Sequence, residues 1–255
     1  MPHCSRRAAA LAATLPVLAG LLATLSPAPA TAAPTAHRAA AAVAPERVVR
    51  DTTGRVRMLA AGGRRAAGLA PSASAATAAR AHLTRVAPLF GVAARDLRVA
   101  GTGRVGSRDV VRFQQTREGL PVFAGELVTV LDRRGGLLSV SGETAQGAGG
   151  AGLTTYDVAA STAARTARRA VAAAHGLAAR SLRGDRPTRW LLDPSLVGPT
   201  GAGLRPVWRV PVRSSARLDV ADLVLVDAVT GRVTLRLSQL ADLDRVVCDD
   251  MRTRT

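Results

Sequence analysis

The sequence contains no lysine, two cysteines and six aromatic side chains among its 255 residues. Two cysteines, Cys4 and Cys248, cannot build the disulfide framework of a small secreted scaffold. All 35 basic residues are therefore arginine, and alanine fills 52 positions. A surface selected for anionic ligands usually mixes both basic residues, so we interpret the Arg and Ala excess as the codon usage of a GC-rich genome. The net charge of +17 is for that reason a weak indication of nucleic-acid binding.

Long apolar runs are also absent beyond the N-terminus. Because a membrane-spanning helix needs about 20 apolar residues, we expect no transmembrane segment in the mature chain. Alanine buries little area, which leaves Leu, Val and the few rings to build the core. The length allows one large domain or two small ones.

Motifs of catalytic chemistry are missing as well. The sequence has neither the His-Glu-x-x-His spacing of a zinc helix nor a Gly-x-Ser-x-Gly nucleophile turn. Two glycine-rich segments, 101–103 and 198–203, lack the lysine of a phosphate-binding loop, so we interpret them as turns. Cys248 has no nearby histidine to activate it. The sequence therefore predicts no catalytic residue, no metal ligand and no cofactor site.

Residues 1–30 show the three parts of a secretory signal peptide. Two arginines lie near its start, an Ala- and Leu-rich run follows over residues 8–25, and small residues precede an expected cleavage after Ala30. We therefore expect a secreted, extracellular protein that has lost Cys4. Residues 31–44, rich in Ala, Pro and Thr, are expected to form a disordered linker.

Residues 45–146 are predicted to form a first folded half. A strand pair is expected over residues 47–59. A helix is expected over residues 72–92, where Leu83, Val86 and Phe90 recur at helical spacing. Period-two segments separated by glycine turns then predict antiparallel strands over residues 110–114, 122–131 and 137–140.

Residues 153–243 repeat this order after a Gly/Ala hinge at residues 147–152, where we place the domain boundary. Asp157 is expected to cap a helix that ends at Gly176. Strands are predicted over residues 206–212, 223–226 and 233–237, with a turn at 227–231. Both halves thus predict the α+β fold class, with one helix laid on an antiparallel sheet.

Two features of the second half allow a choice of interpretation. Arg165, Arg168 and Arg169 lie on one side of its helix and either bind an acidic partner or face solvent. Charged runs on helices usually face water, so we favour the second interpretation. Trp208 lies in an alternating strand, and we expect its ring to be buried against the helix rather than exposed on a binding surface.

The segment 111–142 carries the pattern Phe-x-Gln-x-x-x-Gly-x-Pro-Val-Phe from Phe113 to Phe123. With this pattern the segment resembles the fungalysin/thermolysin propeptide (FTP) module. Residues 206–210 and 226–233 of the second half resemble the PepSY module that follows FTP in such precursors. Residues 244–255 are similar to the junction where a mature thermolysin-type domain begins. The resemblance implies two cystatin-like domains in tandem.

The matching residues are interpreted as architectural. The Gly-Leu-Pro segment turns a hairpin, the two glutamines bond across strands, and three glycines (Gly135, Gly136 and Gly231) supply turns with positive φ. The predicted structural residues are Phe113, Gln114, Gln115, Gly119, Pro121, Val122, Phe123, Gly135, Gly142, Trp208, Asp227 and Gly231.

The function that the resemblance implies is that of a propeptide, which chaperones and inhibits a secreted thermolysin-like zinc metalloprotease as part of a zymogen. Zinc and calcium would belong to the protease domain, none of whose catalytic motif occurs before Thr255. We therefore expect no catalytic, cofactor or metal residue in this chain. The expected partner is the cognate metalloprotease catalytic domain, in cis or in trans.

Two other functions stay open. The chain could be a free-standing secreted inhibitor or chaperone that acts in trans on an exported protease. A third interpretation, resting on charge alone, is a cationic protein that binds an anionic envelope or nucleic acid. Nucleic acid is disfavoured, because there are few aromatic side chains to stack on bases and the arginines are spread evenly.

Overall fold

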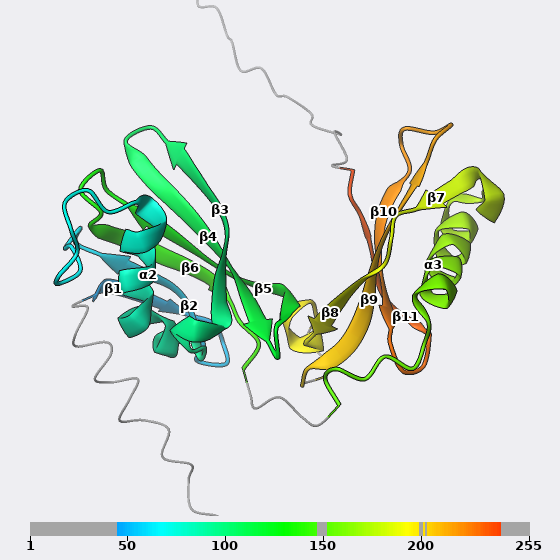
Figure 1. Ribbon diagram of the computed structural model, residues 1–255, viewed down its shortest axis with the longest axis horizontal. Coiled ribbons are helices and arrows are strands. Elements are labelled where there is room, and N and C mark those ends of the chain that lie inside the picture. Colours follow the sequence, from blue (N-terminus) through cyan, green and yellow to red (C-terminus); the bar gives the residue numbers. More distant parts are fainter. Residues whose placement is uncertain (1–44, 147–151, 199–200, 202, 241–255) are drawn as a thin grey trace, which may run out of the picture. The chain divides into compact units, whose positions relative to one another are not determined.

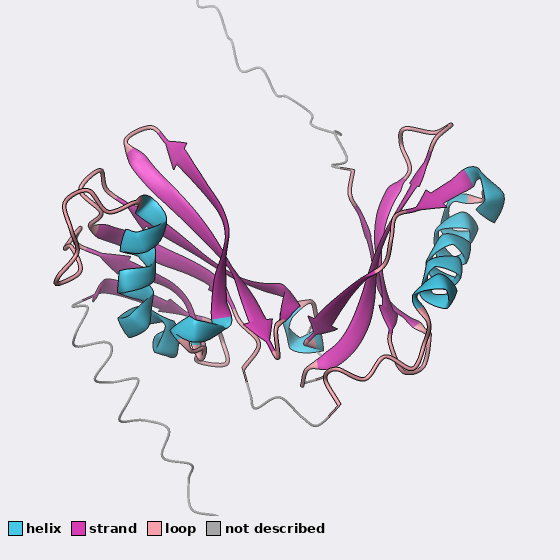
Figure 2. Ribbon diagram, viewed as in Figure 1, coloured by secondary structure: helices cyan, strands magenta, loops and turns pink. Residues whose placement is uncertain are grey.

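The computed structural model is α+β, with a mostly antiparallel sheet and two α-helices in the part of the chain that it describes (Figures 1 and 2). None of the helices in this part has the length and apolarity needed to cross a membrane. The structure describes residues 45–146, 152–198, 201 and 203–240.

Several sequence-based expectations fall outside the described residues. These are the signal peptide at 1–30, the linker at 31–44, the junction at 244–255 and most of the hinge at 147–152. Cys4 and Cys248 lie outside as well. The division into two domains at the hinge therefore stays a prediction.

The first half contains six strands in the order β1-β2-β6-β5-β4-β3, all antiparallel. The β1–β2 pair is the strand pair expected over residues 47–59, and the three strands expected after the helix are β4, β5 and β6. The bounds are β1 Pro45–Arg50, β2 Val56–Ala61, β3 Leu97–Val105, β4 Arg108–Arg117, β5 Leu120–Leu131 and β6 Leu137–Glu143.

Helix α2, Ala75–Val86, covers one face of this sheet. It begins at Ser74, whose hydroxyl accepts a hydrogen bond from the Thr77 backbone N–H at 3.2 Å. That bond satisfies one of the free N–H groups of the first turn. The expected apolar spacing is observed, since Leu83 and Val86 are fully buried.

The helix is shorter than the expected 72–92. A 3₁₀ helix, Ala87–Phe90, follows it, because Pro88 has no N–H to donate to the carbonyl four residues back. Gly91 ends this turn in the left-handed conformation, with a φ of 73°. Phe90 nevertheless reaches the core. A second 3₁₀ turn, Ala94–Asp96, leads into β3.

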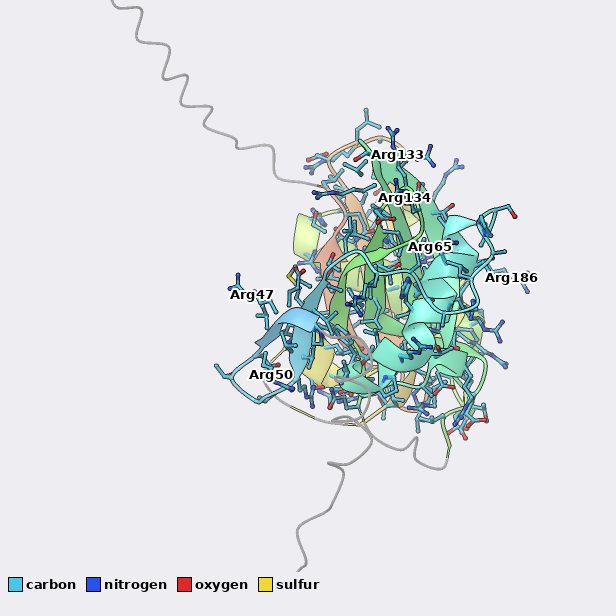
Figure 3. All side chains as sticks on the ribbon, turned by 90° about the vertical axis from the view of Figure 1, so that its left-hand side faces the viewer. Arg47, Arg50, Arg65, Arg133, Arg134 and Arg186 are labelled. Carbon is cyan, nitrogen blue, oxygen red and sulfur yellow. The ribbon has the colours of Figure 1, made fainter. Side chains whose placement is uncertain are left out.

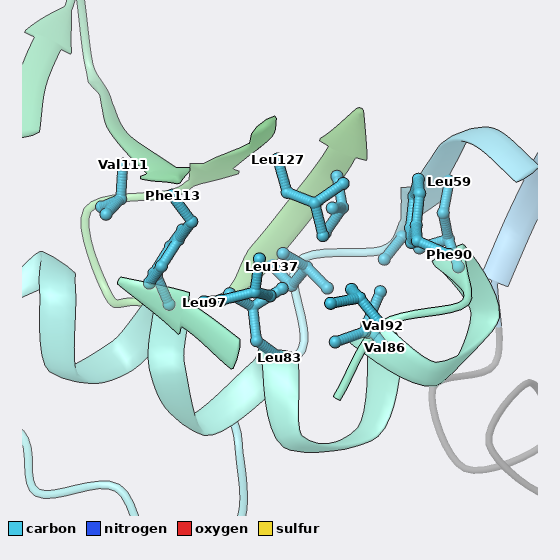
Figure 4. Close-up of a cluster of buried hydrophobic side chains, with 14 of the residues drawn as sticks. Leu59, Leu83, Val86, Phe90, Val92, Leu97, Val111, Phe113, Leu127 and Leu137 are labelled. Atoms are coloured by element: carbon cyan, nitrogen blue, oxygen red, sulfur yellow. The ribbon is translucent and has the colours of Figure 1, made fainter. Parts of the chain in front are cut away.

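The core of the first half lies between α2 and the sheet (Figure 4). Aliphatic side chains and two phenylalanines fill it, each no more than 8% exposed. The side chains labelled in Figure 4 are Leu59, Leu83, Val86, Phe90, Val92, Leu97, Val111, Phe113, Leu127 and Leu137.

The second half contains helix α3, Ala160–His175, and five strands. The strand order is β8-β9-β10-β11, and β7 pairs with the far end of β9. The sequence patterns do not predict β7 or β8. The bounds are β7 Leu182–Gly184, β8 Thr188–Leu192, β9 Arg205–Ser214, β10 Ala221–Asp227 and β11 Val233–Ser238, with 3₁₀ turns at Ala179–Ser181 and Pro194–Leu196.

Asp157 does not cap helix α3, contrary to expectation. The cap is Ala159, which makes no side-chain hydrogen bond, and Asp157 is exposed. The reason lies in the residue between them. Val158 donates its N–H to the carbonyl of Ala228 at 2.8 Å, which holds this segment against β10 and delays the helix start. The predicted end at Gly176 is confirmed, with a left-handed φ of 63°.

Residues 101–103 form part of strand β3, so their interpretation as a turn is wrong. Gly101 pairs with Arg112, and Gly103 pairs with Val110. A β-bulge between Val99 and Gly101 absorbs one residue of β3. The strand lies at the sheet edge, where glycine is tolerated although it lacks a side chain to signal a strand. The described glycines of the segment 198–203 lie outside strands, as expected.

Candidate functional site at the β4–β5 hairpin

The hairpin between β4 and β5 ends in a tight turn at Glu118 and Gly119. Both residues have positive φ, 49° and 76°, which is the conformation of a two-residue turn that matches strand twist. Pro121 follows on β5 and pairs with Thr116 of β4. The expected hairpin turn is thus present, and Glu118 occupies a conformation that favours glycine.

A large bulge interrupts β5 directly after the turn. Four residues, Val122 to Gly125, face the single residue Gln115 on β4. Ala124 has a φ of 60°, which is uncommon for a residue with a side chain. The Gln114 amide nitrogen donates to the carbonyls of Val122 at 2.6 Å and Gly125 at 2.9 Å. Gln114 therefore supplies the cross-strand bonds that the bulge has removed from the backbone ladder.

Gln115 is fully buried on the opposite face of β4. Its side-chain oxygen accepts from the Ala145 N–H at 2.8 Å, and its nitrogen donates to the Ala145 carbonyl at 3.0 Å. A side chain on Gly125 would place its Cβ 2.7 Å from the Gln115 oxygen. The bulge therefore requires glycine there. The roles of Gly125 and Ala145 do not follow from the sequence patterns, because only the folded register brings these residues to Gln115.

The bulge directs the first part of β5 onto a strand of the second half. Val122 and Phe123 pair in parallel with Leu191 and Leu192 of β8. Val122 and Leu191 are fully buried, and the ring of Phe123 lies edge-on to Trp190 at 6.3 Å between centroids. The Val-Phe part of the pattern thus joins the strands of the two halves.

Three other predicted glycines are required either by the space around them or by their backbone conformation. The φ of Gly142 on β6 is 139°, and a Cβ there would lie 2.1 Å from the Glu126 carbonyl oxygen. Gly135 has the positive φ expected, 76°. Gly136 does not, contrary to expectation. Glycine is needed at 136 for space instead, since a Cβ would lie 1.9 Å from the Gly63 carbonyl oxygen.

The turn between β10 and β11 is held by Asp227 and Gly231. The Asp227 carboxylate accepts from the backbone N–H groups of Val229 at 3.0 Å and Thr230 at 2.7 Å, and Gly231 has a φ of 72°. Burial alone would raise the pKa of Asp227, but these backbone donors outweigh it and lower the pKa.

Trp208 lies in the core of the second half, as expected, and is 7% exposed. Its indole N–H donates to the Val158 carbonyl at 2.8 Å, and the ring packs edge-on against Tyr156 at 4.9 Å. Arg189 lies over both rings. Burial raises the pKa of Tyr156 to about 12, with the Arg189 charge acting in the opposite direction.

The described histidines lie in separate places. His82 on α2 is buried, with its Nε2 3.0 Å from the Gly135 carbonyl oxygen. His175, at the end of α3, lies 3.2 Å from Asp222, whose carboxylate also accepts from Arg236 at 2.6 Å. Among the described residues, no three His, Cys, Asp or Glu side chains are grouped closely enough to hold a metal ion.

The region that contains the β4–β5 hairpin matches a motif of a known protein family. Residues 108–144 match the Fungalysin/Thermolysin Propeptide Motif. The match spans β4, β5 and β6 and confirms the expected FTP resemblance over this segment. The FTP motif thus contains the bulge, both glutamines and Gly142. No curated protein matches the chain.

Among solved structures, the chain is similar to the Bacillus megaterium YpeB C-terminal domain. The two share 9% sequence identity with a TM-score of 0.35, and the similarity covers 76% of each chain. At that score and identity, the likeness transfers neither fold nor function to this protein.

Proposed function

We propose that this chain acts as the propeptide of a secreted thermolysin-like metalloprotease and serves as a folding chaperone and inhibitor of its catalytic domain. The match of residues 108–144 to the FTP motif carries the proposal. Secretion through a signal peptide at residues 1–30, an extracellular location and zymogen formation are parts of the same proposal.

The fold supports the rest of the expected architecture. In each half an α-helix packs on one face of an antiparallel sheet, around a core of its own. This arrangement is the one expected for tandem cystatin-like domains, and we propose that the second is of PepSY type. Zinc and calcium would then be held by the protease domain rather than by this chain.

The hairpin geometry explains how the FTP motif would serve such a role. A propeptide acts through a surface of fixed shape, which requires ordered backbone rather than reactive side chains. Gln114 and Gln115 fix the bulge from both faces of β4, and the bulge in turn holds Val122 and Phe123 against β8. The motif therefore sets the geometry of the surface offered to the protease.

A refolding and inhibition experiment tests the proposal. Residues 31–255 are purified and either added to, or fused before, the thermolysin-family catalytic domains secreted by the source organism. We expect a higher yield of active protease on refolding and slower casein hydrolysis by the native enzyme. Activity of the added chain indicates function in trans, and activity only of the fusion indicates function in cis.

Two glycine variants give the matched control. Gly125→Val places atoms against the Gln115 oxygen and should weaken both effects. Gly101→Ala meets nothing within 4 Å and should preserve them. If neither arrangement improves refolding or slows hydrolysis with any of these enzymes, the proposal is wrong.

A further inference from the structure

Helix α3 and the turn that follows it border an open pocket lined by arginine. Arg165, Arg168 and Arg169 lie at spacings of three and four residues, which places them on one helix face. Arg180, in the 3₁₀ turn after the helix, lines the other side of the pocket, and Ala179 is the remaining lining residue. The volume is about 290 Å³. The helix sequence alone favoured a solvated face, because it did not show that Arg180 joins this cluster.

The arginines of this pocket have no ion-pair partner in the described part of the chain. None of its four arginines forms an ion pair there, and Arg165 donates only to the Thr162 hydroxyl at 2.8 Å. Two arginines on the sheet of the same half do form ion pairs, Arg213 with Asp185 and Arg236 with Asp222. A guanidinium stays charged at any physiological pH, so four unpaired charges around one hollow favour an anionic ligand.

One of the four side chains is held in place by its surroundings. The stem of Arg168 is half-buried and packs over Gly184 of β7, where a Cβ would lie 3.6 Å from the Arg168 Cγ. The apolar stem is therefore covered while the guanidinium remains at the pocket. Because the stem is already held, the side chain loses less conformational entropy when a ligand binds.

The size and lining of the pocket disfavour a nucleic-acid strand as its ligand. Guanidinium groups bind carboxylates and phosphates through paired hydrogen bonds. A nucleic-acid strand needs an extended basic groove and aromatic side chains for stacking, whereas this pocket is compact and no aromatic residue lines it. We propose that the arginine pocket binds a short acidic peptide segment, with two or more adjacent Asp or Glu side chains, on a partner protein. Only the identity of that partner, a protease domain, rests on the proposed function.

Calorimetric titration of the full mature chain with tetraglutamate and tetraglutamine tests the pocket directly. We expect binding of tetraglutamate alone. The triple variant Arg165→Gln, Arg168→Gln, Arg169→Gln should bind at least about 10-fold more weakly, because charge-assisted bonds are lost. The control variant carries Arg47→Gln, Arg98→Gln and Arg134→Gln, which remove the same amount of charge at three exposed arginines without ion pairs. Its affinity for tetraglutamate should stay within about 2-fold of that of the parent protein. Arg47 projects from the β1–β2 hairpin in Figure 3.

The single variant Arg180→Gln gives a second measurement, since Arg180 lies outside α3 and its loss leaves the helix intact. It should weaken tetraglutamate binding while the thermal unfolding stays unchanged. Absence of tetraglutamate binding would overturn the proposal. So would equal weakening in the control, or a single-stranded oligonucleotide that displaces tetraglutamate and depends on the same arginines. The titration contains no protease, so its outcome is independent of the inhibition experiment.

Discussion

The two halves bury a helix on a sheet with different side chains. In the first half, large residues come from both layers, with Leu83 on α2 and Phe113 on β4. In the second half, α3 contributes mainly small residues such as Ala163 and Ala167, both fully buried. An alanine surface lets the helix approach the sheet closely, and the bulk comes from valines and from Trp208 on β9. The second core therefore depends on one large ring, whereas the first distributes its apolar area over many side chains.

Among the substitutions considered, Trp208→Ala should cause the largest loss of stability. Removing a buried aromatic side chain costs about 3–5 kcal/mol. It would also remove the hydrogen bond to the Val158 carbonyl. Hydrogen exchange measured on peptides from both halves should show α3 and β9 to β11 losing protection while α2 and β4 to β6 keep theirs. Trp190→Ala is the control, since Trp190 is half-exposed and should cost less. Uniform loss of protection along the chain would contradict the comparison.

Gly142→Ala should destabilise the first half through backbone strain and a steric clash rather than through loss of a buried side chain. Its positive φ disfavours alanine, which costs about 1–3 kcal/mol, and the new Cβ would collide with the Glu126 carbonyl of the adjacent strand. Gly101→Ala on the same sheet meets no atom and has no positive φ, so it should be neutral or stabilise by up to about 1 kcal/mol. Urea unfolding of both variants measures the difference. Similar unfolding midpoints would show that the sheet shifts to accommodate Gly142→Ala.

Sequence patterns predict the elements that short-range interactions hold better than those that long-range pairing holds. Local signals predicted the hairpins, because alternating segments around Gly119 and Gly231 mark strands and a turn without reference to the rest of the chain. They also predicted the helix end at Gly176. Strands β7 and β8 were missed because their short segments carry arginines and pair far along the chain, with β9.

The candidate site shows the same limit. The FTP pattern identified both glutamines and the hairpin turn, whereas the bulge at Ala124 and the contact of Gln115 with Ala145 depend on register. Arg180 joins the arginine pocket only after the chain turns at the end of α3. These contacts link residues whose separation along the sequence carries no periodic signal.

Acid should weaken the first half more than the second through His82. Burial lowers the pKa of His82 and the Arg85 charge lowers it further, although the bond to the Gly135 carbonyl and the Asp132 charge oppose this. The unfolded histidine keeps its ordinary pKa of 6.5. Below that pH the unfolded state takes up a proton that the folded state resists, so stability present above about pH 6.5 is lost as the pH falls.

The measurement is urea unfolding between about pH 7.5 and pH 5.5, with hydrogen exchange to locate the loss. His82→Leu should flatten the pH dependence, because it removes the group whose proton uptake differs between the states. A pH dependence that is unchanged in His82→Leu would assign the effect to another group.

The smallest perturbation, a single backbone cut, tests whether the two cores belong to separate domains. The Gly/Ala composition of residues 147–152 and the composition of residues 31–44 predict that proteinase K cuts first in these segments, because exposed small-residue backbone is a preferred site of nicking. Strands β4 to β6 should resist, since their backbone is hydrogen-bonded within the sheet and their inner faces are buried.

After the cut, the β5–β8 pairing should still hold the two fragments together at neutral pH, and Phe123→Ala should release them on gel filtration. First cuts between Phe113 and Val140 would instead place the boundary inside the first sheet and remove the basis for comparing two independent halves.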